Sequence, residues 1–168
     1  MNRNANHKPA AAEKAAEEKD AKDLWLDPQT SAGYLVRDTH LAFAKALRAR
    51  LQQHDMTTGQ YFFLRALWIE EGLSQRELSR RVGTTEPTTA SAMRVLDKKG
   101  LVRRVRNTGD RRTVNIFLTD RGRGLRGALL AHARDINRAA AGDIAAVELD
   151  RAFDILRTLK RNLDDGAG

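Results

Sequence analysis

The stretch LSQRELSRRVGTTEPTTASAMRVLDKKG, residues 73–100, contains two helix signals separated by a single glycine. Ser74 and Glu77 have the spacing of a capping box, in which each side chain binds the backbone N–H of the other residue. A short helix therefore begins at this point, and Gly83 is the residue type that ends such a helix. The pattern predicts a short helix followed by a tight turn.

A second helix follows that turn and extends to the Lys-Lys-Gly sequence at 98–100. Thr84 and Thr85 are both candidate N-caps, and Pro87 is tolerated in a first helical turn. Helical periodicity predicts an inward face of Thr89, Ala92 or Met93, and Leu96, and an outward face of Thr88, Ser91, Arg94 and Val95. Two short helices joined in this way form a helix-turn-helix.

Two β-favouring runs come next, LVRRVR at 101–106 and TVNIFL at 113–118, separated by residues typical of turns. We interpret them as a β-hairpin with a basic tip. Its arginines are Arg104, Arg106, Arg111 and Arg112. One arginine of the pair at 111–112 is expected to pair with Asp110 and stiffen the loop. The other would enter a minor groove or bind a phosphate, and the sequence leaves open which does which.

Helices are expected on both sides of this module. The apolar pattern predicts them at 33–53, from the capping box at Thr57 to Gly72, at 120–141 after Thr119, and at about 146–163. We expect residues 1–23 to be a disordered N-terminal tail and residues 164–168 a second tail. The fold class is thus mainly α with a small β-hairpin wing, in one domain spanning 24–163.

The positive charge of the chain is concentrated in one segment. Residues 73–124 hold 13 basic and 5 acidic side chains, whereas the rest of the chain holds 17 of each, so the net charge of +8 belongs to this segment. Such a distribution is typical of a polyanion-binding surface. The predicted DNA contacts are Ser74, Gln75, Arg76, Thr84, Thr85, Thr88, Ser91, Arg94, Arg104, Arg106, Arg111 and Arg112.

Several other classes of protein are disfavoured. The chain has no cysteine, so disulfides, thiolate metal sites and thiol redox switches are excluded. No apolar run has the length of a membrane span, and no secretory signal is visible, so a cytoplasmic location is expected. The histidines lack metal-binding spacing, and no nucleophile or phosphate-loop motif occurs. We predict no enzyme activity, no cofactor and no metal.

The combination of motifs resembles the MarR family of regulators. Its pieces are GLSQREL at 72–78, LDKKGLV at 96–102, DRR at 110–112 and LTDRG at 118–122. The resemblance implies a winged helix-turn-helix with N- and C-terminal dimerisation helices, at 33–56 and 119–163, and a homodimer that binds a pseudo-palindromic operator, usually as a repressor. Many members have a basic residue where this recognition helix has Ser91.

Members of this family often release DNA when a small aromatic ligand binds. The residue types that would hold an aromatic carboxylate here are Tyr34, Arg37, His40, Phe43, Tyr61 and Trp68. The alternative is that these aromatic residues form ordinary core. A second alternative for the whole protein is an architectural DNA-binding protein without a ligand switch.

Overall fold

The computed structural model describes residues 27–107, 109 and 113–166. It divides into two compact units, one ending at Ala46 and the other beginning at Leu47. The first unit contains most of helix α2 (Ala32–Leu51), whose last turn belongs to the second unit. The predicted DNA contacts that the structure describes all lie in the second unit, so each unit is described separately below.

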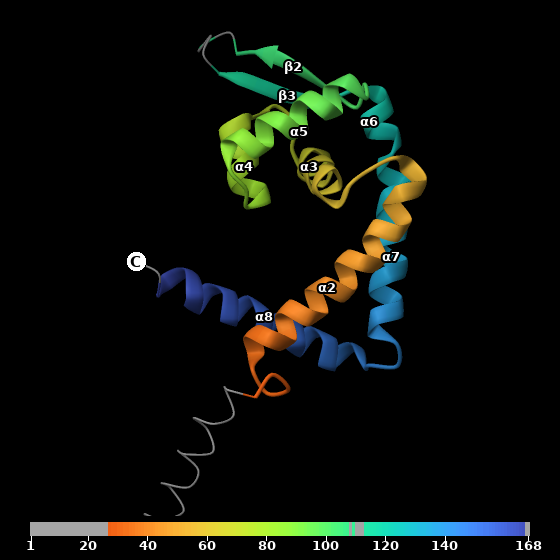
Figure 1. Cartoon of the computed structure of the whole chain (residues 1–168), viewed down its shortest axis with the longest axis vertical. Coiled ribbons are helices and arrows are strands. Elements are labelled where there is room, and N and C mark those ends of the chain that lie inside the picture. The colour runs from red at the N-terminus through yellow and green to blue at the C-terminus, as the bar shows by residue number, and fades with distance from the viewer. Residues whose placement is uncertain (1–26, 108, 110–112, 167–168) are drawn as a thin grey trace, which may run out of the picture. The chain divides into compact units, whose positions relative to one another are not determined.

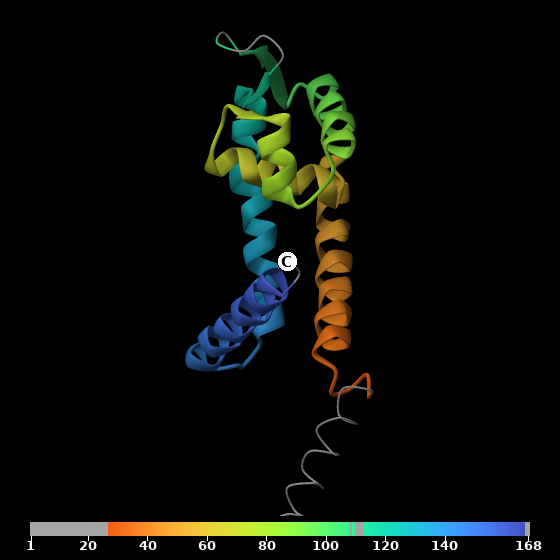
Figure 2. The same cartoon turned by 90° about the vertical axis from the view of Figure 1, so that its left-hand side faces the viewer.

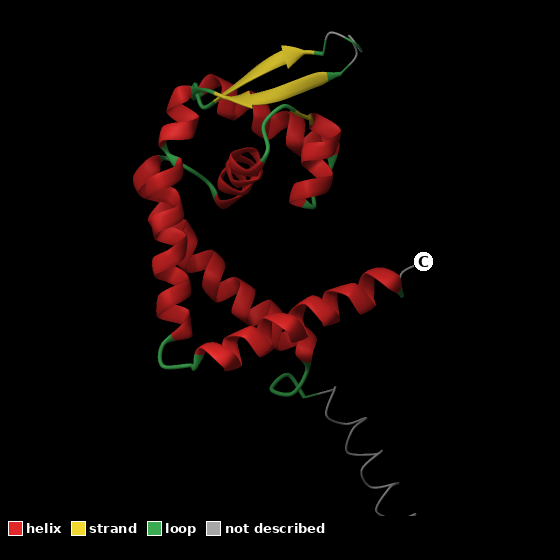
Figure 3. Cartoon of the chain, turned by 180° about the vertical axis from the view of Figure 1, so that it is seen from behind, coloured by secondary structure: helices red, strands yellow, loops and turns green. Residues whose placement is uncertain are grey.

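The second unit continues with a short 3₁₀ helix and then alternates helices and strands. Its elements are η1 (Gln52–His54), α3 (Thr58–Ile69), β1 (Leu73–Ser74), α4 (Gln75–Val82), α5 (Glu86–Lys98), β2 (Val102–Arg106), β3 (Val114–Leu118), α6 (Asp120–Gly124), α7 (Arg126–Ala141) and α8 (Ala146–Asp165). Figure 3 shows that these elements are mostly helical, with the strands gathered at one end. The predicted fold class, a mainly helical protein with a β-hairpin wing, is confirmed.

The three strands form an antiparallel sheet in the order β1-β3-β2. Val102 pairs with Leu118 and Arg106 pairs with Val114, so β2 and β3 form a regular hairpin. The two-residue strand β1 adds to the other edge of β3 through the pair of Leu73 and Ile116. Helices α3, α4 and α5 lie on one side of this hairpin (Figure 1). The hairpin thus projects from the helical module as a wing.

One hydrophobic core holds the helix-turn-helix against the sheet. Leu78 of α4, Met93 and Leu96 of α5, and Ile116 of β3 are all fully buried in it. Burying a side chain of this size contributes about 1.5–3 kcal/mol. Helix α3 also contributes Leu64 to this core, so α4 and α5 pack against each other, against α3 and against the sheet.

The predicted helix caps are confirmed. Thr57 and Gln60 form a capping box at the start of α3, and Ser74 and Glu77 form one at the start of α4. Of the two candidate caps for the second helix, Thr85 is the N-cap of α5. These contacts join residues three positions apart, so the sequence pattern was sufficient to predict them.

Two helices differ from the expectation. Helix α3 ends at Ile69, before Gly72, because the backbone of Glu70 is already extended, with φ −149° and ψ +119°. Gly72, with a φ of +78°, lies beyond the helix, and its N–H donates to the carbonyl of Ile116 in the sheet. The helix predicted over 120–141 is divided into α6 and α7 at Leu125, which lies between Gly124 and Gly127. Glycine lowers the helix propensity of this segment, which favours the interruption.

Helix α8 has an apolar side that the single chain leaves exposed. None of its residues is buried, and Phe153, Leu156 and Leu163 have exposed fractions of 46%, 48% and 75%. In Figure 2, α7 leads away from the winged module and α8 follows it. In the described part of the chain, no helix is both long and apolar enough to cross a bilayer.

Candidate nucleic-acid interface

The turn between α4 and α5 places the two helices in the geometry of a helix-turn-helix. Gly83 ends α4 in the left-handed region, with φ +71° and ψ +42°, a conformation that glycine adopts readily. The N–H of Thr84 then donates to the carbonyl of Ser79 at 2.9 Å and closes the turn. The next residue caps α5, so α5 begins immediately after the turn.

Helix α5 presents a polar face to solvent. Thr89, Met93 and Leu96 are fully buried, as the periodicity predicted. The opposite side consists of Thr88, Ser91, Arg94 and Val95, all exposed. Small hydroxyl side chains on an exposed helix allow the close approach that a DNA major groove about 12 Å wide requires. Arg94 is the basic side chain at the centre of this face.

Thr85 and Thr88 are already joined by hydrogen bonds at the start of α5. The two side-chain Oγ1 atoms lie 2.8 Å apart, and the N–H of Thr88 donates to Thr85 Oγ1 at 3.4 Å. Both residues remain exposed. The cap therefore fixes the orientation of two exposed hydroxyl groups at the N-terminal end of α5.

The start of α4 has a similar closed cap. The Ser74 hydroxyl and N–H donate to Glu77 Oε2 at 2.7 and 2.8 Å. These bonds hold the pKa of Glu77 below its usual value, with the side-chain bond the larger cause. Beside this cap, Arg76 Nε lies 3.9 Å from Glu86 Oε1, and both side chains are largely exposed. A long, exposed pair of this kind is weak and leaves Arg76 available to an anion.

A shallow groove joins the starts of α4 and α5 to the wing. Its volume is about 370 Å³, and its lining residues are Ser74, Gln75, Arg76, Glu86, Arg104, Thr113 and Val114. Four of the residues predicted to contact DNA are thus brought to one depression. Glu86 also lines the groove, although it was not among the predicted DNA contacts.

The arginines of β2 point to different faces of the hairpin. The Arg103 guanidinium lies 4.7 Å from the centre of the Phe117 ring, in a cation–π contact. Arg104 follows it in the strand and lines the groove instead. Arg106 is exposed near the tip, where Asn107 Oδ1 accepts a hydrogen bond from the N–H of Gly109 at 2.8 Å. The predicted contacts Arg111 and Arg112, and Asp110, lie outside the described residues.

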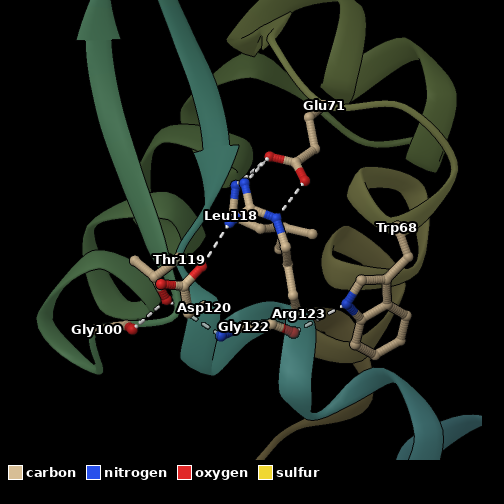
Figure 4. Close-up of polar contacts among 8 residues, drawn as sticks. All are labelled: Trp68, Glu71, Gly100, Leu118, Thr119, Asp120, Gly122 and Arg123. Atoms are coloured by element: carbon tan, nitrogen blue, oxygen red, sulfur yellow. Dashed lines mark hydrogen bonds and ion pairs between the residues drawn. The ribbon is translucent and has the colours of Figure 1, made fainter.

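The base of the wing is held by an ion-pair network that sequence reasoning missed (Figure 4). Arg123 donates from Nε and Nη2 to the two carboxylate oxygens of Glu71, at 2.9 and 2.8 Å. Its Nη1 lies 3.0 Å from Asp120 Oδ1, and the N–H of Leu118 donates to Glu71 Oε2 at 3.1 Å. The network joins the loop after α3 to β3 and α6.

The hydrogen bond from Arg123 is the main cause that lowers the pKa of Glu71 below its usual value. The Arg123 pKa is correspondingly raised by this bond. No local sequence signal indicated this pair, because Glu71 and Arg123 are 52 residues apart. The network therefore holds the wing on the helical module.

The residues predicted to bind an effector fall in both units. In the first unit, Tyr34 is half-exposed, and Arg37 pairs with Asp38 at 2.8 Å. His40 is exposed and Phe43 half-buried. The second unit contains Tyr61, which is 1% exposed, and Trp68, whose Nε1–H donates to the Gly122 carbonyl.

The sequence is similar to those of known helix-turn-helix regulators. A family model described as the MarR family matches residues 56–114. The chain is 35% identical over 142 residues to the HTH-type transcriptional regulator TtmR of Methylorubrum extorquens, covering 83% of this chain and 70% of TtmR. It is 30% identical to the HTH-type transcriptional regulator SarZ of Staphylococcus saprophyticus over 139 residues, covering 83% and 90% of the two chains.

Solved structures show the same fold. The PcaV transcriptional regulator from Streptomyces coelicolor, in complex with its natural ligand, is similar with a TM-score of 0.69 and 30% identity, covering 80% of this chain and 95% of that one. The MepR–DNA complex of S. aureus has a TM-score of 0.73 at 24% identity, with coverage of 78% and 97%.

Proposed function

This chain belongs to the MarR family of transcriptional regulators, and we propose that it is a homodimeric repressor that binds a pseudo-palindromic operator. It is a DNA-binding regulator and not an enzyme, in agreement with the sequence analysis. The proposal has four parts: the operator, the dimer, repression and the response to a ligand. The groove supports the operator contact, helix α8 supports the dimer, and Tyr61 supports the ligand.

The observation that carries the proposal is the groove between α4, α5 and the wing. It brings Arg76, Arg104 and the capped start of α4 together with Glu86, the first residue of α5. We assign Arg94 and the hydroxyl groups of α5 to base edges in the major groove. We assign Ser74, Gln75 and Arg76 to phosphates, which position the protein without reading sequence. Arg104 and Arg106 then extend the contact along the wing.

The exposed apolar side of α8 supports a homodimer. Phe153, Leu156 and Leu163 would be covered by a second copy of the chain, and burying them would stabilise the dimer. A two-fold dimer presents two α5 helices, which must lie about 34 Å apart to occupy successive major grooves on one side of DNA. Because the two-fold axis relates the two helices, the two half-sites of the operator should also be related by two-fold symmetry, which makes the operator pseudo-palindromic.

A small aromatic acid is the proposed effector. The Tyr61 hydroxyl is buried, and no partner for it occurs in the described part of the chain. A buried hydroxyl without a partner costs free energy unless a water or ligand group binds it. Tyr61 also contacts Trp68, with ring centres 6.2 Å apart. An aromatic carboxylate supplies both a ring and a hydrogen-bonding group for such a site.

The test of the proposed function is a DNA competition experiment. Fluorescence anisotropy would measure binding to fragments from upstream of the protein's own gene, with random duplex of the same length as competitor. A sequence-specific regulator should prefer its operator by about 10³-fold or more, and its affinity should fall steeply with salt. Equal affinity for random duplex would instead indicate an architectural DNA-binding protein, and no binding at low salt would refute the proposal.

A further inference from the structure

Two histidines far apart in the sequence meet in the second unit. The Nε2 atoms of His54, the last residue of η1, and His132, in α7, lie 3.0 Å apart. The ring centres lie 5.2 Å apart, with an angle of 54° between the planes. The distance between the ring centres exceeds the distance between the two Nε2 atoms by about two ring radii. Both nitrogens therefore lie nearly on the line that joins the ring centres. One Nε2–H therefore points at the lone pair of the other ring.

This contact accepts one added proton but not two. The first added proton binds the free Nδ1 of the donor ring, which leaves an imidazolium whose Nε2–H still donates to the neutral ring. A second added proton places hydrogen on both Nε2 atoms, so neither can accept. The doubly protonated pair therefore loses its hydrogen bond and holds two like charges at a distance of 3.0 Å, so it must separate.

The same geometry disfavours a metal ion at this pair. Two imidazoles that chelate one ion direct both lone pairs at a third point, whereas these nitrogens face each other. In the described ranges, no group of three histidine or acidic side chains could hold a metal. The arrangement suits a shared proton.

The charged groups next to the pair belong to ion pairs of their own. Asp55 follows His54, and its Oδ2 lies 2.9 Å from Lys99 Nζ. On α7, Asp135 is one turn beyond His132 and its carboxylate lies 3.6 Å from Arg138 Nη1. Both acids already neutralise a cation, so neither compensates fully for a second charge at the histidines.

The residue that follows η1 contacts helix α5. Lys99, the C-cap of α5, donates to the backbone carbonyl of Asp55 and lies 3.5 Å from Gln60 Oε1. Asp55 has a φ of +48°, and η1 is only three residues long. A displacement of η1 away from α7 would therefore act directly on the end of α5.

We propose that the His54–His132 contact makes DNA binding by this protein sensitive to pH. With at most one charged imidazole, the contact holds η1 on α7 and supports the position of α5. When both imidazoles are charged, η1 separates from α7 and DNA affinity falls. Histidine is the side chain that gains a charge as the pH falls from neutral, so the loss of DNA affinity is expected on acidification. The inference rests on the proposed function for its effect on DNA, but not for the contact itself.

The contact is tested first by NMR on the full-length protein. The imidazole ¹⁵N shifts of His54 and His132 should each respond to two separated proton-binding steps. In His132→Gln, which keeps a polar side chain without the charge, His54 should titrate in one step. Independent single-step titration of both rings in the wild type would overturn the inference, and this readout requires neither DNA nor a stable variant.

The second test compares operator affinity at pH 7.5 and pH 5.5. We expect the wild type to lose about tenfold more affinity than His132→Gln or His54→Gln over this range, a typical size for coupling between sites. His7→Gln is the matched control and should respond as the wild type does. An unchanged pH response in both variants would refute the role of the pair. Absence of DNA binding at pH 7.5 would refute the proposed function instead, while the NMR titration still decides the contact.

Discussion

The indole Nε1 of Trp68 donates a hydrogen bond of 3.0 Å to the carbonyl oxygen of Gly122, which joins α3 to α6 (Figure 4). The N–H of Gly122 donates to Thr119 Oγ1 at 3.1 Å, so both backbone polar groups of this glycine are bound. A Cβ on Gly122 would lie inside the contact distance of the Leu101 carbonyl oxygen. The close packing of α6 therefore requires glycine at this position.

Substitution of Gly122 by alanine should strongly destabilise the protein. The new methyl group would collide with backbone, which cannot move as a flexible side chain can, so we expect a loss of about 2–3 kcal/mol. Gly124→Ala is the matched control, because nothing lies within 4 Å of an added Cβ there. That variant should lie within about 1 kcal/mol of the wild type. Urea unfolding measures the free energy of unfolding of both variants. Equal values for Gly122→Ala and Gly124→Ala would contradict the close contact at Gly122.

The Glu71–Arg123 pair should make stability depend on pH. Arg123 holds the pKa of Glu71 below its usual value of 4.5, so the ionised carboxylate stabilises the folded state above about that pH. The contribution is lost as the pH falls through the lowered pKa. Thermal unfolding should therefore show Glu71→Gln with a lower Tm than wild type at pH 7, and a smaller difference at pH 3.

The control for Glu71→Gln is Asp154→Asn, which removes a carboxylate from an exposed ion pair with Arg157 on α8. Exposed pairs contribute little, so this variant should have nearly the wild-type Tm at both pH values. A Glu71→Gln protein as stable as the wild type at pH 7 would show that the network contributes nothing to the folded state.

Arg94 should determine part of the base specificity. Loss of a base contact costs about 1–3 kcal/mol, so Arg94→Ala should weaken operator binding by about 5- to 150-fold and reduce the preference over random duplex. Arg138→Ala, on α7 and largely exposed, is the matched control and should bind as the wild type does. Anisotropy titrations with operator and random duplex give both quantities. If Arg94→Ala lost affinity for the two duplexes equally, Arg94 would be a phosphate contact.

The apolar side of α8 should control assembly. Leu156→Lys places a charge in the proposed interface, and we expect the dimer dissociation constant to rise by about tenfold or more. Thr158→Lys adds the same charge on the opposite side of the helix and should leave assembly unchanged. Sedimentation equilibrium across a concentration series measures the constant. A Leu156→Lys protein that associates as tightly as the wild type would exclude this side of α8 from the interface.

Much of the DNA-binding module could be predicted because its signals are local. The capping box of Ser74 and Glu77 and the cap at Thr85 join residues three positions apart. The buried face of α5 follows from helical periodicity alone. For the same reason, the sequence alone was sufficient to assign Arg94 to the exposed face of α5.

The sequence by itself determined most of the helices, the β-hairpin and the buried face of α5, since these depend on interactions between residues close together in the chain. Only the tertiary structure decided which distant residues meet. Glu71 reaches Arg123 across 52 residues, and His54 reaches His132 across 78. Such pairs leave no periodic pattern, because their separation is set by the packing of whole elements around the core. That packing therefore produced both the support of the wing and the histidine contact between η1 and α7.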